Sequence, residues 1–408
     1  MKSANSIRTM FALGLILIGL LGCGKIFISS KSQAKIIQFS VNGAESTAST
    51  SSNSIFRSVS GLRGANYVRL SPVDGWHSTF GVDRYDAARA QKALNDLAAS
   101  GYNSVRVFID VTSDTGTSAK MSAPGINEKY LNNLFDFLRY AQSKNIFVII
   151  TSQWSPQNYA IYYKNLSNGV GGLNGMYLNP QHVNSNIKFF EDLAKAIQGA
   201  SLANAVLAFD LHNEGEFRNN ESPLNSRTGT FKAPNGKSYS LASADERQAM
   251  LDDAVIHWIN LTAAAIHSQI PNVLITQSVF SPFLVRGTER VAFRLVAIEK
   301  SSVDYLDAHI YAQNTSDIDT EIAELGVRSL VQQKPMIVGE MGFLSNKSVA
   351  EGDSLIRATY QKTCQSGFSG WLFWTWDSDE QTDWRNLVKD NGALNGVFAP
   401  VARACTHI

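Results

Sequence analysis

Ala205-Val206-Leu207-Ala208-Phe209-Asp210-Leu211, followed at once by His212-Asn213-Glu214, is the stretch that decides the fold of this chain. Its first seven residues are almost all apolar, which is typical of a strand that is covered on both faces. A carboxylate directly after such a strand is costly unless it is paired or lies in a solvated cleft. We therefore interpret 205–211 as a parallel strand that carries polar groups at its carboxyl end.

Seven other segments show similar short apolar runs, and they alternate with longer stretches whose apolar residues recur every three or four positions. We expect strands at 61–67, 104–109, 146–151, 205–211, 273–277, 305–310, 336–339 and 370–374, and helices at 83–100, 128–144, 183–197, 244–268, 318–332 and 352–366. Such alternation predicts a parallel sheet. A doubly wound sheet alternates as well, but eight strands favour a closed barrel. The expected fold class is α/β, a (β/α)8 TIM barrel in a single domain.

The N-terminus has the pattern of an export signal. Lys2 and Arg8 precede the apolar run 10–21, which is too short to span a bilayer. Leu20-Leu21-Gly22-Cys23 resembles the bacterial lipoprotein box, in which the signal is cut before a cysteine that then carries lipid. An uncleaved anchor, or a secretory signal with a chance cysteine, is the alternative. The expected division is 1–22 for the signal peptide, 23–57 for the lipidated cysteine and a Ser/Thr-rich tether, and 58–408 for the barrel.

Composition narrows the choice of partners. The chain carries 36 Lys+Arg against 35 Asp+Glu, so it lacks the basic excess of a nucleic-acid binder. Its 21 Phe, 13 Tyr and 7 Trp exclude a wholly disordered chain. Removal of the signal peptide would take away two basic residues and no acidic residue. The remaining chain would then lack the excess of basic residues that binds anionic lipids. We expect a monomer outside the cytoplasm that contacts the membrane only through lipid on Cys23. Cys364 and Cys405 are either bridged or two buried free thiols.

Two of the predicted strands end in glutamate. Glu214 follows the strand quoted above, and Glu340 follows the apolar run 335–339. In (β/α)8 enzymes the catalytic groups project from the carboxyl ends of the strands. Glycoside hydrolysis needs two carboxyl groups that flank the scissile bond. The alternative is that either glutamate caps a helix or pairs with an arginine. The polar and aromatic residues at the strand ends are Arg106, Trp154, Asn213, Glu214, His309, Tyr311, Glu340 and Trp374.

Most of this ordered set resembles glycoside hydrolase family five, the cellulase and mannanase barrel of the retaining clan. The residues that carry the resemblance are Arg106, Asn213-Glu214, His309-x-Tyr311, Glu340 and Trp374, within a span from about Gly61 to Trp384. The resemblance implies that Glu214 is the general acid/base and Glu340 the nucleophile. It also implies that Arg106 and Tyr311 are partners of the nucleophile.

The same resemblance assigns the remaining positions. It implies that Asn213 donates to the sugar 2-hydroxyl, that His309 lies beside the acid/base, and that Trp374 floors the sugar subsite. Family members often carry proline after the acid/base, whereas Gly215 stands here. Trp154 lies where many cellulases have a histidine, which is more like the mannanase branch. The substrate class that we expect is therefore β-mannan or β-glucan.

The expected activity is that of a retaining endo-β-glycosidase, with a transglycosylase or a non-catalytic glycan-binding lipoprotein as alternatives. We expect Arg106 to lower the pKa of Glu340, and the charge of Glu340 to raise the pKa of Glu214. No metal is expected, because His212 and Glu214 share a strand face without a second histidine. No cofactor is expected, because Phe231 and Asn174 stand where a P-loop and a dinucleotide-binding motif need glycine.

The segments that follow the strands are rich in aromatic residues. We expect several of these rings to line a groove for sugar, because exposed rings are otherwise unfavourable. They are Trp76, Trp154, Tyr159, Tyr162, Tyr163, Phe217, Trp376 and Trp384. Residues 215–239 lack an apolar period, and we expect them to form a loop beside the acid/base.

Overall fold

The computed structural model describes residues 59–109, 118–120, 123–166, 169–332, 334–401 and 405. All of them belong to one compact unit. The signal peptide, Cys23 and the tether lie outside the described residues, so their assignments stay predictions. Within the described ranges, no helix is both long enough and apolar enough to span a bilayer.

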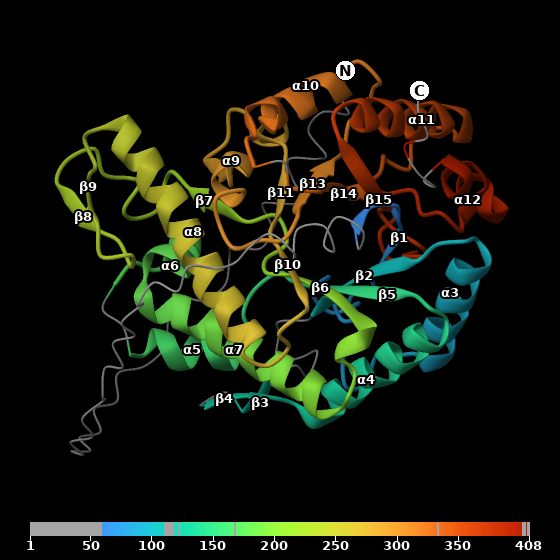
Figure 1. The fold of residues 1–408 in the computed structure, drawn as a ribbon, viewed down its shortest axis with the longest axis horizontal. Coiled ribbons are helices and arrows are strands. Elements are labelled where there is room, and N and C mark those ends of the chain that lie inside the picture. Colours follow the sequence, from blue (N-terminus) through green and yellow to red (C-terminus); the bar gives the residue numbers. More distant parts are fainter. Residues whose placement is uncertain are drawn as a thin grey trace. The chain divides into compact units, whose positions relative to one another are not determined.

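The strands form a closed parallel barrel (Figure 1). The sheet order is β10-β6-β5-β2-β1-β15-β14-β13-β11. Its two ends, β10 and β11, are consecutive pieces of one strand that is interrupted at Gln277, so the sheet closes on itself and the predicted eight-stranded barrel is confirmed. The strands are β1 (Leu62–Tyr67), β2 (Ser104–Ile109), β5 (Phe147–Ser152), β6 (Val206–Asp210), β10 (Leu274–Thr276), β11 (Ser278–Phe280), β13 (Leu306–Ile310), β14 (Met336–Met341) and β15 (Phe368–Phe373).

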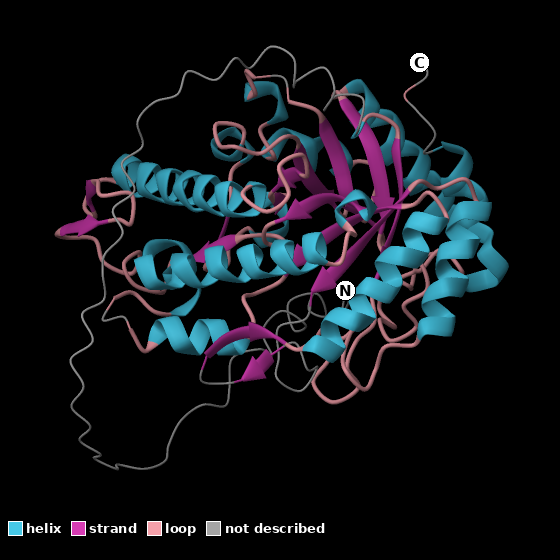
Figure 2. Ribbon diagram, turned by 60° about the horizontal axis from the view of Figure 1, so that its bottom comes forward, coloured by secondary structure: helices cyan, strands magenta, loops and turns pink. Residues whose placement is uncertain are grey.

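Helices cover the outside of the barrel (Figure 2). They are α3 (Ala87–Ala99), α4 (Glu128–Ser143), α5 (Gln157–Lys164), α6 (Gly172–Leu178), α7 (Pro180–Gly199), α8 (Ala244–His267), α9 (Leu295–Ile298), α10 (Asp317–Glu324), α11 (Val349–Gln365) and α12 (Lys389–Val401). Capping decides where several of them begin and end. Asp86 accepts a hydrogen bond from the Arg89 N–H, so α3 begins later than the predicted 83–100. Gly326, with φ 73°, follows α10 and ends it short of the predicted 318–332.

The barrel interior changes from apolar to polar along the strands. An apolar layer that includes Val59, Leu62, Ile149, Tyr305, Ile337 and Leu372 fills the amino ends. On β13, Asp307 and His309 follow Tyr305 at every second position, and residues two apart share a strand face. Both side chains are fully buried. The polar layer is therefore built above the apolar one, toward the carboxyl ends.

Three short antiparallel strand pairs lie outside the barrel sheet in the described part of the chain, and two of them correct the sequence analysis. β7 (Glu216–Arg218) pairs with β12 (Arg290–Ala292), and β8 (Thr230–Lys232) pairs with β9 (Ser238–Ser240). The prediction of an irregular loop over 215–239 is thus wrong in detail, because these strands are too short to show an alternating pattern. β3 (Ser118–Lys120) and β4 (Ala123–Ile126) form the third pair of strands.

A disulfide joins Cys364 at the end of α11 to Cys405, and it decides between the two alternatives that the sequence left open. The Cys405 Sγ also lies 3.2 Å from the carbonyl oxygen of Phe368, the first residue of β15. The C-terminal tail is therefore fastened to the amino end of the last strand.

Replacing both Cys364 and Cys405 by alanine should lower the free energy of unfolding. The bridge closes a loop with a sequence separation of 41, for which the chain-entropy model gives about 4 kcal/mol. Urea unfolding of the two proteins measures the difference. Reductant should destabilise the wild type by a similar amount and leave the double variant unaffected. An unchanged unfolding midpoint in the variant would contradict the prediction.

Candidate active site

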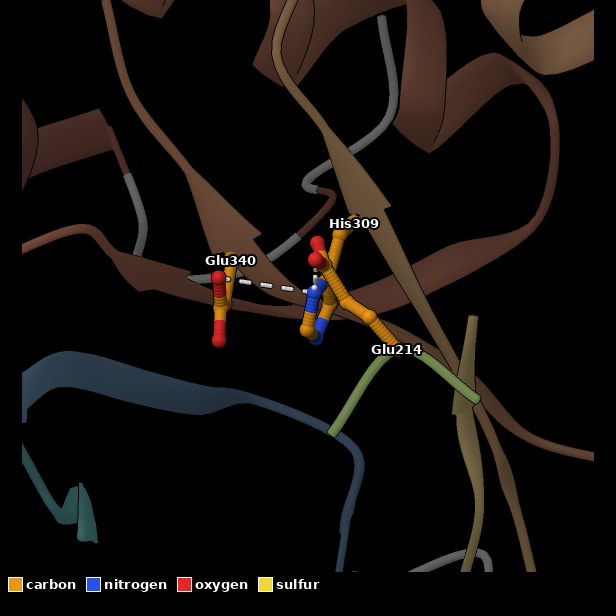
Figure 3. Close-up of side chains that lie close together, drawn as sticks. All are labelled: Glu214, His309 and Glu340. Carbon is orange, nitrogen blue, oxygen red and sulfur yellow. Dashed lines mark hydrogen bonds and ion pairs between the residues drawn. The ribbon is translucent and has the colours of Figure 1, made fainter. Parts of the chain in front are cut away.

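Glu214, His309 and Glu340 meet at the carboxyl ends of the strands, with the His309 ring between the two carboxylates (Figure 3). The Nδ1 atom of His309 lies 2.9 Å from Glu214 Oε1 and 3.4 Å from Glu340 Oε2. His309 and Glu340 are direct neighbours in the register of β13 and β14. The structure thus brings together two glutamates and a histidine that the sequence pattern predicts to lie in one site.

Glu214 lies four residues after the end of β6, so the conformation of the following loop determines its position. β6 ends at Asp210, and Glu214 has a left-handed backbone with φ 54°. Its N–H donates to Ser278 Oγ over 3.2 Å. A Cβ added to Gly215 would lie 2.2 Å from the Phe293 ring, so packing of that ring accounts for glycine at the position where proline is frequent.

Arg106 organises the floor of the site. Its guanidinium is fully buried and forms ion pairs with Glu340 and, over 2.7 Å, with Asp210. It also donates to Asn66 Oδ1 over 2.9 Å and to Asn213 Oδ1 over 2.7 Å. The predicted contact between Arg106 and Glu340 is therefore confirmed. Because Asn213 accepts through Oδ1, its Nδ2 group is the donor, and it contacts Gln153 Oε1 at 3.0 Å.

The second oxygen of Glu340 accepts a hydrogen bond from the Tyr311 hydroxyl. Tyr311 is itself fixed from behind, since its N–H donates to the buried Glu321 over 3.0 Å. Arg106 and Tyr311 thus each contact one oxygen of the same carboxylate, which orients Glu340 and stabilises its anion.

Burial dominates the pKa values of the site. It raises the pKa of Glu214 to about 7, and the charges of Arg290 and Arg106 oppose this rise. Burial also raises the pKa of Glu340, against the influence of His309, Arg106 and the Tyr311 hydroxyl. Our expectation of a lowered pKa for Glu340 is therefore wrong, because desolvation outweighs the nearby guanidinium. Burial lowers the pKa of His309 to about 4, so its ring is neutral near pH 7.

The aromatic residues divide between core and site. Trp374 is 7% exposed and meets Phe108 edge-on, with ring centroids 5.7 Å apart. Trp154 is half-buried, and its ring lies 5.3 Å from that of His212. The position of the remaining aromatic residues after strands predicts that they line a groove. Tyr159, Phe217 and Trp376 are instead buried in the core, Trp76, Tyr163 and Trp384 are partly exposed, and Tyr162 is exposed.

Sequence reasoning missed three buried polar groups of this site, namely Asn66, Asp210 and Asp307. Asp210 accepts from Arg106, from Thr151 Oγ1 at 2.9 Å and from the Ser278 N–H at 2.8 Å. The signal was available, because one acid inside an otherwise apolar strand requires a buried partner.

The same three side chains that carry the site also have a spacing that suits a metal ion, since one ligand atom each of Glu214, His309 and Glu340 lie within 4.8 Å of one another. The partners of Glu340 favour a different use. A dication here would sit beside the Arg106 guanidinium, which already neutralises this carboxylate. The donor set fits proton transfer and nucleophilic attack.

Glu214→Gln should stabilise the protein at pH 8. Its pKa of about 7 in the folded state lies above the ordinary value of 4.5. The native state therefore holds this proton more tightly, and the wild type loses stability as the pH rises from about 4.5 to 7, by at most about 3 kcal/mol. Urea unfolding of both proteins at pH 4 and pH 8 measures the change.

The matched control is Glu351→Gln. Hydrogen bonds from Ser348 lower the pKa of this exposed helix-capping glutamate, so the variant should be less stable than the wild type at neutral pH and the difference should fade in acid. A Glu214→Gln protein that is less stable than the wild type at pH 8 would contradict the raised pKa of Glu214.

The fold has counterparts among solved structures. The exo-β-1,4-mannosidase Op5Man5 from Opitutaceae bacterium strain TAV5 superposes with a TM-score of 0.57 at 16% identity, over 84% of this chain and 59% of that one. The endo-1,4-β-mannanase from Rhizomucor miehei gives 0.59 at 15% identity, over 84% and 95%. The GH5_18 structure from Streptomyces cattleya in complex with GlcNAc gives 0.56 at 14% identity, over 84% and 80%.

No protein-family model and no curated protein sequence matches the chain. The chain spans 59% of the length of the exo-mannosidase. At these identities the likeness concerns the fold, and the described part of this chain is a (β/α)8 barrel similar to those of solved β-mannanases and of a GH5 structure.

Proposed function

We propose that this chain is a retaining β-glycosidase in which Glu214 is the general acid/base and Glu340 the nucleophile. The observation that carries the proposal is that one oxygen of Glu214 and one of Glu340 lie within 4.8 Å of each other. Retaining glycosidases place their two carboxyl groups about 5–5.5 Å apart, whereas inverting enzymes need about 6.5–9.5 Å to admit a water molecule. The barrel fold and the position of both residues at the strand ends support the same reading.

The reaction proceeds in two displacements at one carbon. A carboxylate oxygen of Glu340 bonds to the anomeric carbon while the glycosidic C–O bond breaks, and the departing oxygen takes the proton of Glu214. Glu214, now an anion, then removes a proton from water, whose oxygen replaces Glu340 at the anomeric carbon. Tyr311 and Arg106 hold Glu340 in line for the attack. Asn213 presents its amide donor to the 2-hydroxyl, and Trp374 provides the ring below the sugar.

The proposed substrate is a β-linked polysaccharide of the β-mannan type, with β-glucan second, cut at internal bonds. The solved structures of similar fold include proteins named as β-mannanases and an exo-β-1,4-mannosidase, and Trp154 supplies an aromatic ring after the third barrel strand. Transfer of the glycosyl group to a sugar in place of water would use the same residues. Product sizes from mannan, β-glucan and xylan distinguish these outcomes.

We further propose that the enzyme is exported and held outside the cytoplasm by lipid on Cys23. The Cys364–Cys405 bridge supports this location, because such bridges persist in oxidising compartments. Acyl chains on one cysteine provide the membrane affinity that the nearly neutral chain lacks.

The two glutamates should respond differently to removal. Glu340→Ala should lose on the order of 10⁴ or more in rate, and azide should restore part of it as a product of inverted configuration. Glu214→Ala should fail on polysaccharide yet still react with aryl glycosides whose leaving groups need no protonation. Azide should then give a product of retained configuration, since it attacks the intermediate from the face opposite Glu340.

A 2-fluoro sugar substrate should label Glu340, which mass spectrometry of the peptides identifies. Glu351→Ala, at an exposed position in the first turn of α11, is the control for substitution of a glutamate. An inverted wild-type product in early NMR spectra, or a label on another residue, would overturn the assignment of both roles.

Cys23→Ser should release the protein from the membrane fraction of the expressing cells, because the expected anchor is the lipid on this cysteine. Detergent phase partition of both proteins measures the effect. The Cys364→Ala, Cys405→Ala double variant should stay with the membranes. Wild-type protein that partitions wholly into the aqueous phase would refute the anchor.

A further inference from the structure

Asp307 is a buried acid for which the mechanism above has no use. It lies on β13 two residues before His309, on the same strand face, and its side chain is inaccessible to solvent. Its Oδ1 is 3.8 Å from His309 Nε2. Among the described residues, the backbone N–H of Gly339 is a neighbour of the Asp307 carboxyl group, but neither Asp307 oxygen nor His309 Nε2 has a partner at full hydrogen-bond geometry. Two unsatisfied polar groups therefore face each other behind the catalytic pair.

The neighbouring strand β14 makes room for this carboxyl group because it has a glycine at position 339. A Cβ added to Gly339 would lie 2.0 Å from Asp307 Oδ1. Gly339 immediately precedes Glu340, so the same residue that admits the Asp307 side chain begins the segment that presents the nucleophile. The contact between Asp307 and His309 is thus part of how β13 and β14 fit together at the site.

The charges around Asp307 favour its neutral form. Asp210 on β6 and Glu340 on β14 are further carboxyl groups near it, Arg106 on β2 is the cation, and Tyr305 directly precedes β13. Burial and the two neighbouring carboxylates raise the pKa of Asp307 well above its ordinary value. A neutral carboxylic acid carries one O–H donor, and an unpaired imidazole nitrogen is its natural acceptor.

We propose that Asp307, as a neutral carboxylic acid, is a positioning residue that donates a hydrogen bond to His309 Nε2 and so fixes the tautomer of His309 that carries its proton on Nδ1. The proposal rests on the proposed function of Glu214 as acid/base. An approach of about 1 Å brings the 3.8 Å separation within hydrogen-bond range.

This tautomer of His309 leaves the acidic proton of Glu214 on the oxygen that can reach the leaving group. With Nδ1–H as donor to Glu214 Oε1, the acidic proton of Glu214 resides on Oε2 and remains available to the leaving group. After the first displacement the same N–H stabilises the Glu214 anion, which must then act as base. With the proton on Nε2, a bare Nδ1 would instead accept the proton of Glu214 and withdraw it from the reaction.

Asp307→Leu and Asp307→Asn test the proposal as a pair. Leucine cannot donate, so Asp307→Leu should lower kcat/KM on polysaccharide about 10- to 100-fold, within the range of general acid catalysis. On aryl glycosides with activated leaving groups, kcat/KM should stay near that of the wild type while kcat and KM fall together, because only the second step needs Glu214. Asparagine keeps a donor without a charge, so Asp307→Asn should retain polysaccharide activity within about three-fold.

The pH profile gives a second readout. Loss of the Nδ1–H donor removes a hydrogen bond to the Glu214 anion, so the alkaline limb of kcat/KM should move to higher pH in Asp307→Leu and stay in place in Asp307→Asn. The charged or titratable groups near Glu214 include Arg290 on β12, Glu216 on β7, Arg106, Asp210, Glu340, Tyr311 and the neutral His309, and both variants leave them intact.

A third readout needs no substrate. The ¹⁵N chemical shifts of the imidazole report which nitrogen carries the proton, and the signal of His309 is assigned by its loss in His309→Gln. The wild type and Asp307→Asn should show Nδ1 protonated, and Asp307→Leu should show the proton on Nε2 or a mixture of both forms. This measurement stands even if the wild type cleaves none of the polysaccharides, which would refute the proposed function alone.

Three results would overturn the role of Asp307. They are a wild-type His309 protonated on Nε2, a folded Asp307→Leu protein with wild-type activity and pH profile, and an Asp307→Asn protein as impaired as Asp307→Leu. The last would show that Asp307 acts as an anion. If Asp307→Leu fails to fold, the wild-type tautomer and the Asp307→Asn kinetics still decide the question.

Discussion

The buried guanidinium of Arg106 is the interaction on which the site depends. It contacts side chains from three other segments of the barrel, namely Glu340, Asp210 with Asn213, and Asn66. Each of these acids would be prohibitively costly to bury alone, and a single cation with several directed N–H donors makes their burial possible. Removing this one side chain would leave two carboxylates uncompensated in the barrel and Asn213 without the contact that aims its amide.

The barrel could be predicted because its strands are covered on both faces and therefore have continuous apolar runs, and because polar residues end these runs. The break in the strand at Gln277 could not be predicted. The side-chain amide of Gln277 donates a hydrogen bond of 2.5 Å to the carbonyl oxygen of His212, which is 65 residues away in the sequence. The burial of Phe217 and Trp376 also depends on which elements pack over them. An aromatic ring after a strand is equally compatible with core and with cleft, so sequence alone did not separate them.

The two glutamates of the candidate site and their electrostatics were predictable to different degrees. Glu214 and Glu340 were identified by position, and their convergence follows from a closed sheet, whose strand ends share one edge. The sign of the pKa change at Glu340 depends on how completely the site excludes water, and no sequence pattern reports this. The raised pKa of Asp307 could not be predicted from the sequence either. Burial raises its pKa most, and the charges of Asp210 and Glu340, which come from distant parts of the chain, raise it further.

The fastening of the chain ends has a consequence for access by a large polymer. Val59, where the described chain begins, belongs to the apolar layer at the amino ends of the strands, and the disulfide-bonded Cys405 contacts the first residue of β15 at the same end. Glu214 and Glu340 lie at the carboxyl ends. The described chain therefore begins at the end of the barrel opposite Glu214 and Glu340. For the proposed anchored enzyme, attachment at that end keeps the attachment point away from the strand ends that a long glycan would have to reach.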